Sequence, residues 1–342
     1  MVERTRRDFL FGAMAMTLHK ADWTQTPRLD LAALRSRRDW QKAREQILTG
    51  MQLVMGQLPE PKKLSNEITT LSSVETSAFT QTKIKYIAEP GDLVDAYLLV
   101  PKALKRKAPA MLCLHQTIKI GKGEPVGLGG NPNLHYAKEL AERGYVCIVP
   151  DYPYLGENTF DPYKHGYLSC TMKGIVNHRR AVDVLQSLAM VDKRRIGSIG
   201  HSLGGHNTLF VAAFDERIRA MVTSCGFTKA SKYYNGNLKG WGGERYMPLV
   251  EKQYHNDPNQ LPFDFPEILV ALAPRPLFIN APLHDSNFEV SGVRDCEAVA
   301  RPVYQKIFRA DTHLVAMYPD AGHEFPPAIR QQAYAFLDRH LS

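Results

Sequence analysis

Hydrophobic and polar positions change their period repeatedly along the second half of the chain, and these changes predict alternating strands and helices. Short apolar runs predict buried strands at 108–115, 145–150, 195–200, 218–225, 276–282 and 314–319. Apolar residues at helical spacing predict helices at 134–143, 172–190, from 203 onwards, 291–310 and 328–340. Strands that alternate with helices pair in parallel through right-handed crossovers. Because several strands are apolar throughout, we expect a doubly wound α/β sheet covered on both faces.

The first part of the chain follows a different pattern. Apolar residues at helical spacing predict a helix over 29–58, which ends before Pro59. Alternating runs at 79–88 and 93–100 flank Glu89-Pro90-Gly91-Asp92 and predict a hairpin. We therefore expect a helical extension over 21–78 and a main domain over 79–342. The segment 226–270 is rich in Tyr, Asn, Gly and Trp and weakly periodic, which is typical of an insertion that forms a lid or a pocket wall.

The first twenty residues carry a targeting pattern. Arg6-Arg7 is followed by Asp8, by Phe9-Leu10 and by a short apolar stretch with small residues. This pattern resembles a twin-arginine export signal, which implies a periplasmic or extracellular protein. The alternative is an ordinary basic N-terminal helix on a cytoplasmic protein.

Charge and cysteine usage narrow the class of protein. The formal net charge is +8, but the longest basic run is only Lys105-Arg106-Lys107, so the sequence disfavours a nucleic-acid binder. No apolar run reaches the ~18 residues of a membrane span, and we expect no stable membrane anchoring. The five cysteines form no C-x-x-C pair and no metal-ligand spacing, so we interpret them as core residues. We expect neither a metal nor an organic cofactor.

The strongest chemical signal is Gly200-His201-Ser202-Leu203-Gly204, which has the form G-x-S-x-G. It follows a predicted strand and opens a predicted helix, the setting of a nucleophile elbow. Small residues at 200 and 204 let the backbone turn sharply and expose the Ser202 hydroxyl at the carboxyl end of the sheet. The helix N-terminus behind the serine favours developing negative charge. The alternative is a glycine-rich turn in which Ser202 only caps the helix.

With this motif in its strand–turn–helix context, the chain resembles the α/β-hydrolase superfamily from about residue 79 to its C-terminus. Within it, the chain looks like the dienelactone hydrolase and acetyl xylan esterase-like group of bacterial esterases. The resemblance implies an eight-stranded, mostly parallel sheet with helices on both faces. It also implies a catalytic triad in the chain order serine, acid, histidine.

Two further residues fit the triad that the resemblance implies. His323 lies on the loop after the last predicted strand, whereas the rival histidines 201, 313 and 340 fit that place less well. Asp285 follows the penultimate predicted strand, and Asp320 and Glu289 are its competitors. In this arrangement His323 takes the proton of Ser202, and Asp285 holds the imidazole in one tautomer.

The oxyanion hole and the substrate pocket are less well specified. One donor is the backbone N–H of Leu203, and the other is that of Thr117 or Gln116, because His115-Gln116 replaces the His-Gly pair of many relatives. The glycine-rich stretch 121–130 is typical of a mobile loop beside the site. Side chains expected to line the pocket are His115, Tyr152, Tyr154 and Trp241, although the aromatic ones fit equally well as packing for the inserted segment.

These residues predict a serine esterase that cleaves a small-molecule or carbohydrate ester through an acyl-enzyme. A serine peptidase of the same fold is an alternative, but the ~78 residues before the main domain are too few for the propeller of such enzymes. A non-catalytic ligand-binding member is the other alternative, and the complete serine, aspartate and histidine set argues against it. Fold alone does not choose the substrate.

Overall fold

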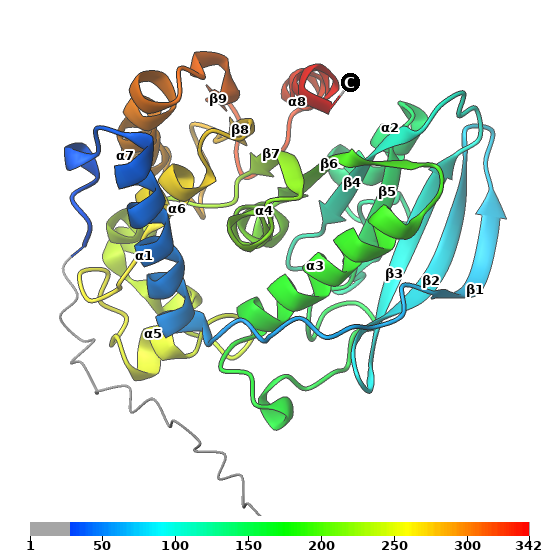
Figure 1. Cartoon of the computed structure of the whole chain (residues 1–342), viewed down its shortest axis with the longest axis horizontal. Helices are drawn as coiled ribbons and strands as arrows, with labels where there is room; N and C mark the ends of the chain where they lie inside the picture. The colour runs from blue at the N-terminus through cyan, green and yellow to red at the C-terminus, as the bar shows by residue number, and fades with distance from the viewer. Residues whose placement is uncertain (1–27, 342) are drawn as a thin grey trace, which may run out of the picture.

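One sheet organises the part of the chain that the structure describes. The computed structural model describes residues 28–341, so the twin-arginine pattern at 1–20 lies outside the described residues. The strand order is β1-β2-β3-β5-β4-β6-β7-β8-β9. The strands β1, β2, β3 and β5 pair antiparallel in that order, and every pairing from β5 onwards is parallel. Figure 1 shows the antiparallel strands at one end of the molecule.

The elements alternate along the chain from β4 onwards, as the sequence predicts. The strands are β1 (Ile68–Glu75), β2 (Phe79–Glu89), β3 (Asp92–Pro101), β4 (Ala108–Leu114), β5 (Val146–Pro150), β6 (Val191–His201), β7 (Ile218–Ser224), β8 (Leu277–Asn280) and β9 (Leu314–Met317). The α-helices are α1 (Arg37–Met55), α2 (Tyr136–Glu142), α3 (Cys170–Ser187), α4 (Leu203–Phe214), α5 (Leu249–Lys252), α6 (Phe265–Leu272), α7 (Val290–Pro302) and α8 (Pro327–Leu341).

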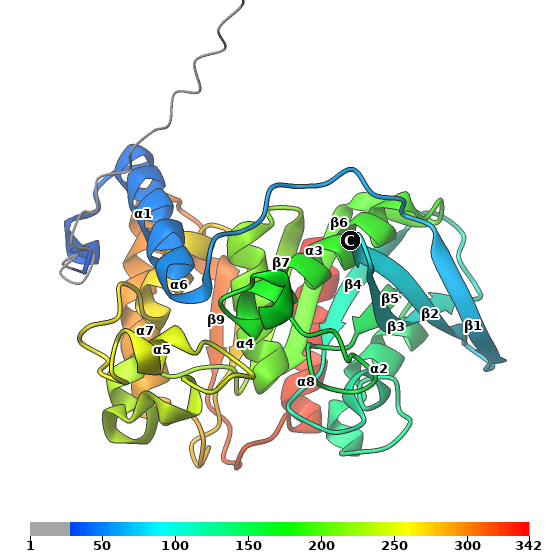
Figure 2. The same ribbon diagram turned by 90° about the horizontal axis from the view of Figure 1, so that it is seen from below.

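Helices cover the parallel strands on both faces. Along β4, Ala110 and Leu112 belong to the hydrophobic cluster that contains residues of α1, α3, α4, α6 and α7. Met111 and Cys113 point the other way, into the cluster that contains residues of α2 and α8. Figure 2 shows α3 and α4 on one side of the sheet and α8 on the other. Because successive side chains of a strand face opposite layers, a strand between two helix layers has to be apolar throughout.

The structure corrects the predicted N-terminal part and the strand count. Within residues 28–341 the sheet has nine strands and not eight, because β1 pairs with β2 inside the region expected to be a helical extension. The sheet therefore begins at Ile68 and not at residue 79. The helix expected over 29–58 is shorter, because α1 begins after its N-cap Ser36 and ends at Met55, before Gly56, whose φ is 93°. Among residues 28–341, no helix is both long and apolar enough to cross a membrane.

The inserted segment is part of the packed core and covers α4. Its aromatic side chains pack on those of α4: the rings of Trp241 and His206 stack with centroids 4.4 Å apart, and Phe265 lies 6.2 Å from Phe210. Helix α1 anchors the same region, since Trp40 Nε1 donates to the carbonyl oxygen of Val270 at 2.8 Å. The segment is therefore held against the elements that carry the elbow.

Buried histidines make the fold sensitive to acid. Burial lowers the pKa values of His178, His201 and His206 to about 3. These groups add stability above their unfolded pKa of 6.5, and that stability is lost as the pH falls towards 3, because unfolding lets them bind protons. Each contributes a slope of about 1.4 kcal/mol per pH unit in this range. We expect the free energy of unfolding, measured in urea, to fall by on the order of 5 kcal/mol from pH 7 to pH 5.

His206 offers the sharpest test of this slope. Its two ring nitrogens have no hydrogen-bond partner among the described residues, and its ring stacks on Phe210. His206→Phe removes the titrating group and keeps a flat ring. In this variant the free energy of unfolding should depend less steeply on pH, by about 1.4 kcal/mol per pH unit, whatever its value at pH 7. An unchanged slope would contradict the assignment.

Candidate active site

Ser202 occupies a sharp turn between β6 and α4. Its φ is 53° and its ψ is −119°, a conformation that costs free energy for any residue except glycine. The turn needs glycine on both sides. A Cβ at Gly200 would lie 2.2 Å from the carbonyl carbon of Gly204, and a Cβ at Gly204 would lie 1.8 Å from the carbonyl oxygen of Leu114. The G-x-S-x-G pattern therefore corresponds to a strained elbow that holds Ser202 at the carboxyl end of the sheet.

His323 and Asp285 form a hydrogen-bonded pair at the same sheet edge. His323 follows β9, Asp285 follows β8, and His323 Nδ1 lies 2.9 Å from Asp285 Oδ1. The Asp285 side chain is 1% exposed and that of His323 is 20% exposed. Burial opposes ionisation of Asp285, but the hydrogen bonds from His323 and from the backbone N–H groups of Phe288 and Asn287 lower its pKa below the usual value. An ionised Asp285 fixes the proton of His323 on Nδ1, which leaves Nε2 free to accept a proton.

The two competing carboxylates, Asp320 and Glu289, form hydrogen bonds with residues other than His323. Asp320 Oδ1 lies 2.9 Å from His284 Nε2, and both side chains are exposed. Glu289 is exposed and accepts a hydrogen bond from Ser291. Of the three carboxylates considered from the sequence, the structure joins Asp285 to His323.

Ser202 lies at this sheet edge directly after His201, whose ring packs near that of His323. The Ser202 backbone N–H donates to the carbonyl oxygen of Ser224 at 2.8 Å, which ties the elbow to the end of β7. The rings of His201 and His323 lie with centroids 4.8 Å apart. Among the described residues, Ser202 Oγ makes no hydrogen bond with His323; such contacts are often long in enzymes without substrate and tighten when substrate binds.

A polar network beneath the pair holds the His323 loop, and sequence reasoning missed it. Asn280 Nδ2 donates to Ser224 Oγ and to the carbonyl oxygen of Glu324, both at 2.9 Å. Ser224 Oγ also lies 2.9 Å from His201 Nδ1. The ends of β6, β7 and β8 and the loop after β9 are thereby joined. In the sequence, this network is indicated only by the polar residues His201, Ser224 and Asn280, which end β6, β7 and β8.

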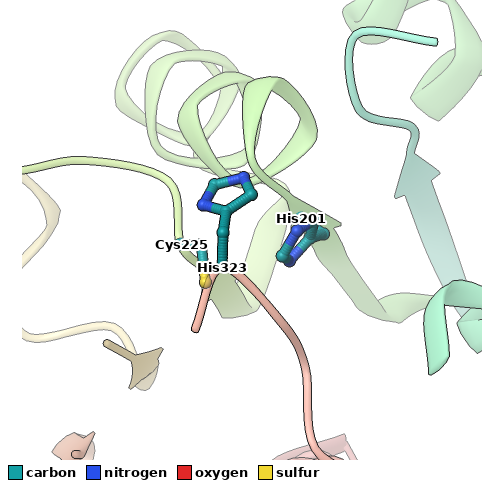
Figure 3. Close-up of side chains that lie close together, drawn as sticks. All are labelled: His201, Cys225 and His323. Carbon is teal, nitrogen blue, oxygen red and sulfur yellow. The ribbon is translucent and has the colours of Figure 1, made fainter. Parts of the chain in front are cut away.

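Cys225 lies in the same cluster. It follows β7 with a φ of 47°, and its thiol donates to the carbonyl oxygen of Glu324 at 3.4 Å. Burial and the nearby Asp285 carboxylate raise the pKa of the Cys225 thiol well above its usual value. Cys225 is therefore a neutral thiol next to His323. Figure 3 shows His201, Cys225 and His323 close together on three segments.

The residues expected to form the oxyanion hole lie around the elbow. Leu203 is the first residue of α4, so its N–H is one of the free donors at a helix N-terminus. The backbone N–H groups of Gln116 and Thr117 have no hydrogen-bond partner among the described residues. Gln116 Nε2 donates to both carboxylate oxygens of the buried Glu124, at 3.1 and 2.9 Å. Thr117 Oγ1 lies 3.0 Å from the hydroxyl of Tyr246 in the inserted segment.

The glycine-rich stretch beside these donors is largely buried, unlike the mobile loop expected from its composition. Lys122 is 3% exposed and pairs with Asp151 at 2.5 Å and with Glu157 at 2.5 Å. Burial opposes the charge on Lys122, but these two carboxylates raise its pKa above the usual value. The ion pairs tie the loop after β4 to the loop after β5.

The structure assigns different surroundings to the four expected pocket residues. His115 is buried rather than pocket-lining: its Nε2 accepts the N–H of Tyr152 at 3.0 Å, and burial lowers its pKa. Tyr152 is buried against Leu203, and its hydroxyl donates to the carbonyl oxygen of Arg245. Tyr154 is 38% exposed and donates to Asp161. Trp241 stacks on His206 within the aromatic cluster of the inserted segment.

Comparison with known proteins agrees with this fold and elbow. A family model described as "alpha/beta hydrolase fold" matches residues 109–254, and one described as "Abhydrolase family" matches residues 4–163. The chain has the α/β-hydrolase fold. This hydrolase is 26% identical to YtaP of Bacillus subtilis (strain 168), which is named as a hydrolase, over 84% of the chain and 96% of that protein.

Solved structures show the same fold at low sequence identity. A glucuronoyl esterase from Solibacter usitatus superposes with a TM-score of 0.65 at 17% identity, over 90% of this hydrolase and 94% of that chain. Acetyl xylan esterase 1 from Thermoanaerobacterium sp. JW/SL YS485 superposes with a TM-score of 0.56 at 16% identity, over 92% of this hydrolase and 95% of that chain. The expected superfamily and fold class are confirmed, and the triad assignment stays a prediction.

Proposed function

We propose that this α/β-hydrolase is a serine esterase that cleaves a carboxylic ester through an acyl-enzyme. The observation that carries the proposal is the hydrogen bond between His323 Nδ1 and Asp285 Oδ1, 2.9 Å long, beside the strained Ser202 elbow. A nucleophile, a base with a free nitrogen and an ionised carboxylate are the three parts that acyl transfer to serine requires.

The proposed reaction has two halves. Ser202 Oγ attacks the ester carbonyl while His323 Nε2 takes the hydroxyl proton, and the N–H of Leu203 with that of Gln116 or Thr117 binds the oxyanion. His323 then protonates the leaving alcohol, which departs and leaves the acyl group on Ser202. Water attacks the acyl-enzyme with the same histidine as base. Asp285 stabilises the imidazolium in both halves.

We propose a carbohydrate ester as the substrate class. The structures of this fold named above include a glucuronoyl esterase and an acetyl xylan esterase, which supports this choice. The rim of the site offers hydroxyl groups from Thr117 and Tyr246, whose side chains are partly exposed. Hydroxyl-bearing and aromatic side chains suit a sugar, which has many polar groups and apolar faces.

The test is hydrolysis of p-nitrophenyl acetate, acetylated xylo-oligosaccharides and alkyl glucuronate esters by the purified chain. We expect turnover of the activated ester and of at least one carbohydrate ester. Turnover of the activated ester alone would remove the carbohydrate assignment, and turnover of neither would remove esterase function. Aminoacyl-nitroanilides test the peptidase alternative, and we expect no product from them.

A further inference from the structure

Three metal-ligating side chains converge at the carboxyl edge of the sheet. His201, Cys225 and His323 each place one ligand atom so that all three atoms lie within 4.8 Å of one another. They come from the end of β6, the residue after β7 and the loop after β9 (Figure 3). Parallel pairing of β6 with β7 brings the first two together, and so the cluster has no spacing signal in the sequence.

The donor set is typical of zinc-class ions. Imidazole nitrogen and thiolate sulfur are the ligands that Zn²⁺ prefers, at about 2.0–2.3 Å. Tetrahedral coordination at those bond lengths puts ligand atoms about 3.3–3.8 Å apart, so the cluster has to contract by roughly 1 Å. His323 lies on a loop, so its own approach to the ion needs no movement of a strand.

Two independent features favour a cation at this point. Asp285 Oδ2 is buried and has no hydrogen-bond partner among the described residues, although Oδ1 of the same carboxylate holds His323. Cys225 is a non-glycine residue with a φ of 47°, a conformation that costs backbone energy, and its Sγ lies in the cluster. An uncompensated carboxylate oxygen beside a thiol and two imidazoles makes the site favourable for a divalent cation.

We propose that His201, Cys225 and His323 bind one zinc-class divalent cation, and that the bound ion inhibits the enzyme. Binding breaks the Cys225 S–H bond, forms a sulfur–metal bond and releases the proton to solvent, and nothing is oxidised or reduced. One ring nitrogen of His323 is hydrogen-bonded to Asp285, and the other is available to take the proton of Ser202. A metal ion on either nitrogen therefore prevents His323 from acting as the base. Only the inhibition rests on the proposed function; the binding does not.

The binding test uses Co²⁺ as a spectroscopic substitute for Zn²⁺ and needs no enzyme activity. Titrating the full chain should produce one equivalent of a thiolate-to-cobalt charge-transfer band in the near ultraviolet, and Zn²⁺ should abolish the band. Cys225→Ser should lose the band and weaken binding by at least about 100-fold, and Cys225→Ala should do the same. Ser202→Ala should keep the band, and Cys296→Ser, which changes a buried cysteine on α7, should keep it too.

Inhibition is measured separately, with each variant compared with its own metal-free rate. Micromolar Zn²⁺ should inhibit the wild type reversibly, a chelator should restore activity, and Mg²⁺ and Ca²⁺ should have no effect because they prefer oxygen ligands. Absence of the cobalt band, or a band that survives in both folded Cys225 variants, overturns the site. If the band forms but Zn²⁺ does not inhibit an active esterase, the inhibitory role is overturned. If the band forms and the enzyme is inactive without metal, metal binding is established and the esterase proposal is removed.

Discussion

Ser202→Ala should lower kcat/KM for p-nitrophenyl acetate by at least ~10³-fold and leave the fold unchanged. The Ser202 hydroxyl is the group proposed to form the acyl-enzyme, and alanine at this position keeps the backbone. The remaining activity should be that of the oxyanion donors and of substrate binding alone. The measurement is initial-rate kinetics, together with thermal unfolding to establish that the variant folds.

The control for this variant is Ser286→Ala. Ser286 is exposed and lies next to Asp285, on the same loop as the proposed acid. It should retain activity within about twofold of the wild type, because surface substitutions change stability little. If Ser202→Ala keeps more than a tenth of the wild-type rate, Ser202 is not the nucleophile.

Asp285→Asn should lower kcat by about 10⁴-fold, with a smaller change in KM. The amide has nearly the shape of the carboxylate, so the loop keeps its form. It carries no charge to stabilise the imidazolium, and an amide N–H facing His323 favours the wrong tautomer. Steady-state kinetics at several pH values should show that higher pH does not restore the rate, because the missing charge is needed after proton transfer to His323.

Asp320→Asn is the matched control, because Asp320 belongs to the His323 loop but pairs with His284 in solvent. Exposed ion pairs contribute little, about 0–1 kcal/mol, so we expect a change of at most a few fold. Equal losses in the two variants would mean that loop shape matters and the Asp285 charge does not. A larger loss in Asp320→Asn would make Asp320 the acid.

The parallel strands of the sheet were predicted well because a strand that is buried on both faces leaves a short apolar run in the sequence. A strand such as β5, which is buried along its whole length, has to be apolar throughout, and this pattern is visible in the sequence alone. Strand β1 was missed because all but one of its residues are exposed, and Ile68 is half-buried. An edge strand with no buried face has no hydrophobic alternation to detect.

In the candidate site, too, some features could be predicted from the sequence and others could not. Ser202, Asp285 and His323 could be selected because each follows a strand in a fixed chain order. The contacts that hold them depend on side chains far apart in sequence: Asn280 and Glu324 are separated by 44 positions and meet only in the folded chain. The burial of His115 depends likewise on the loop after β5, which no local pattern places against it.

The most direct test of the central claim is intact-mass and peptide mass spectrometry after treatment with a serine-directed phosphonate. The account predicts a single adduct per chain, on the peptide that contains Ser202, at a rate that Asp285→Asn strongly reduces. It also predicts no adduct on Ser202→Ala. Labelling of a different residue, or no labelling of a folded chain that hydrolyses esters, would contradict a mechanism through Ser202.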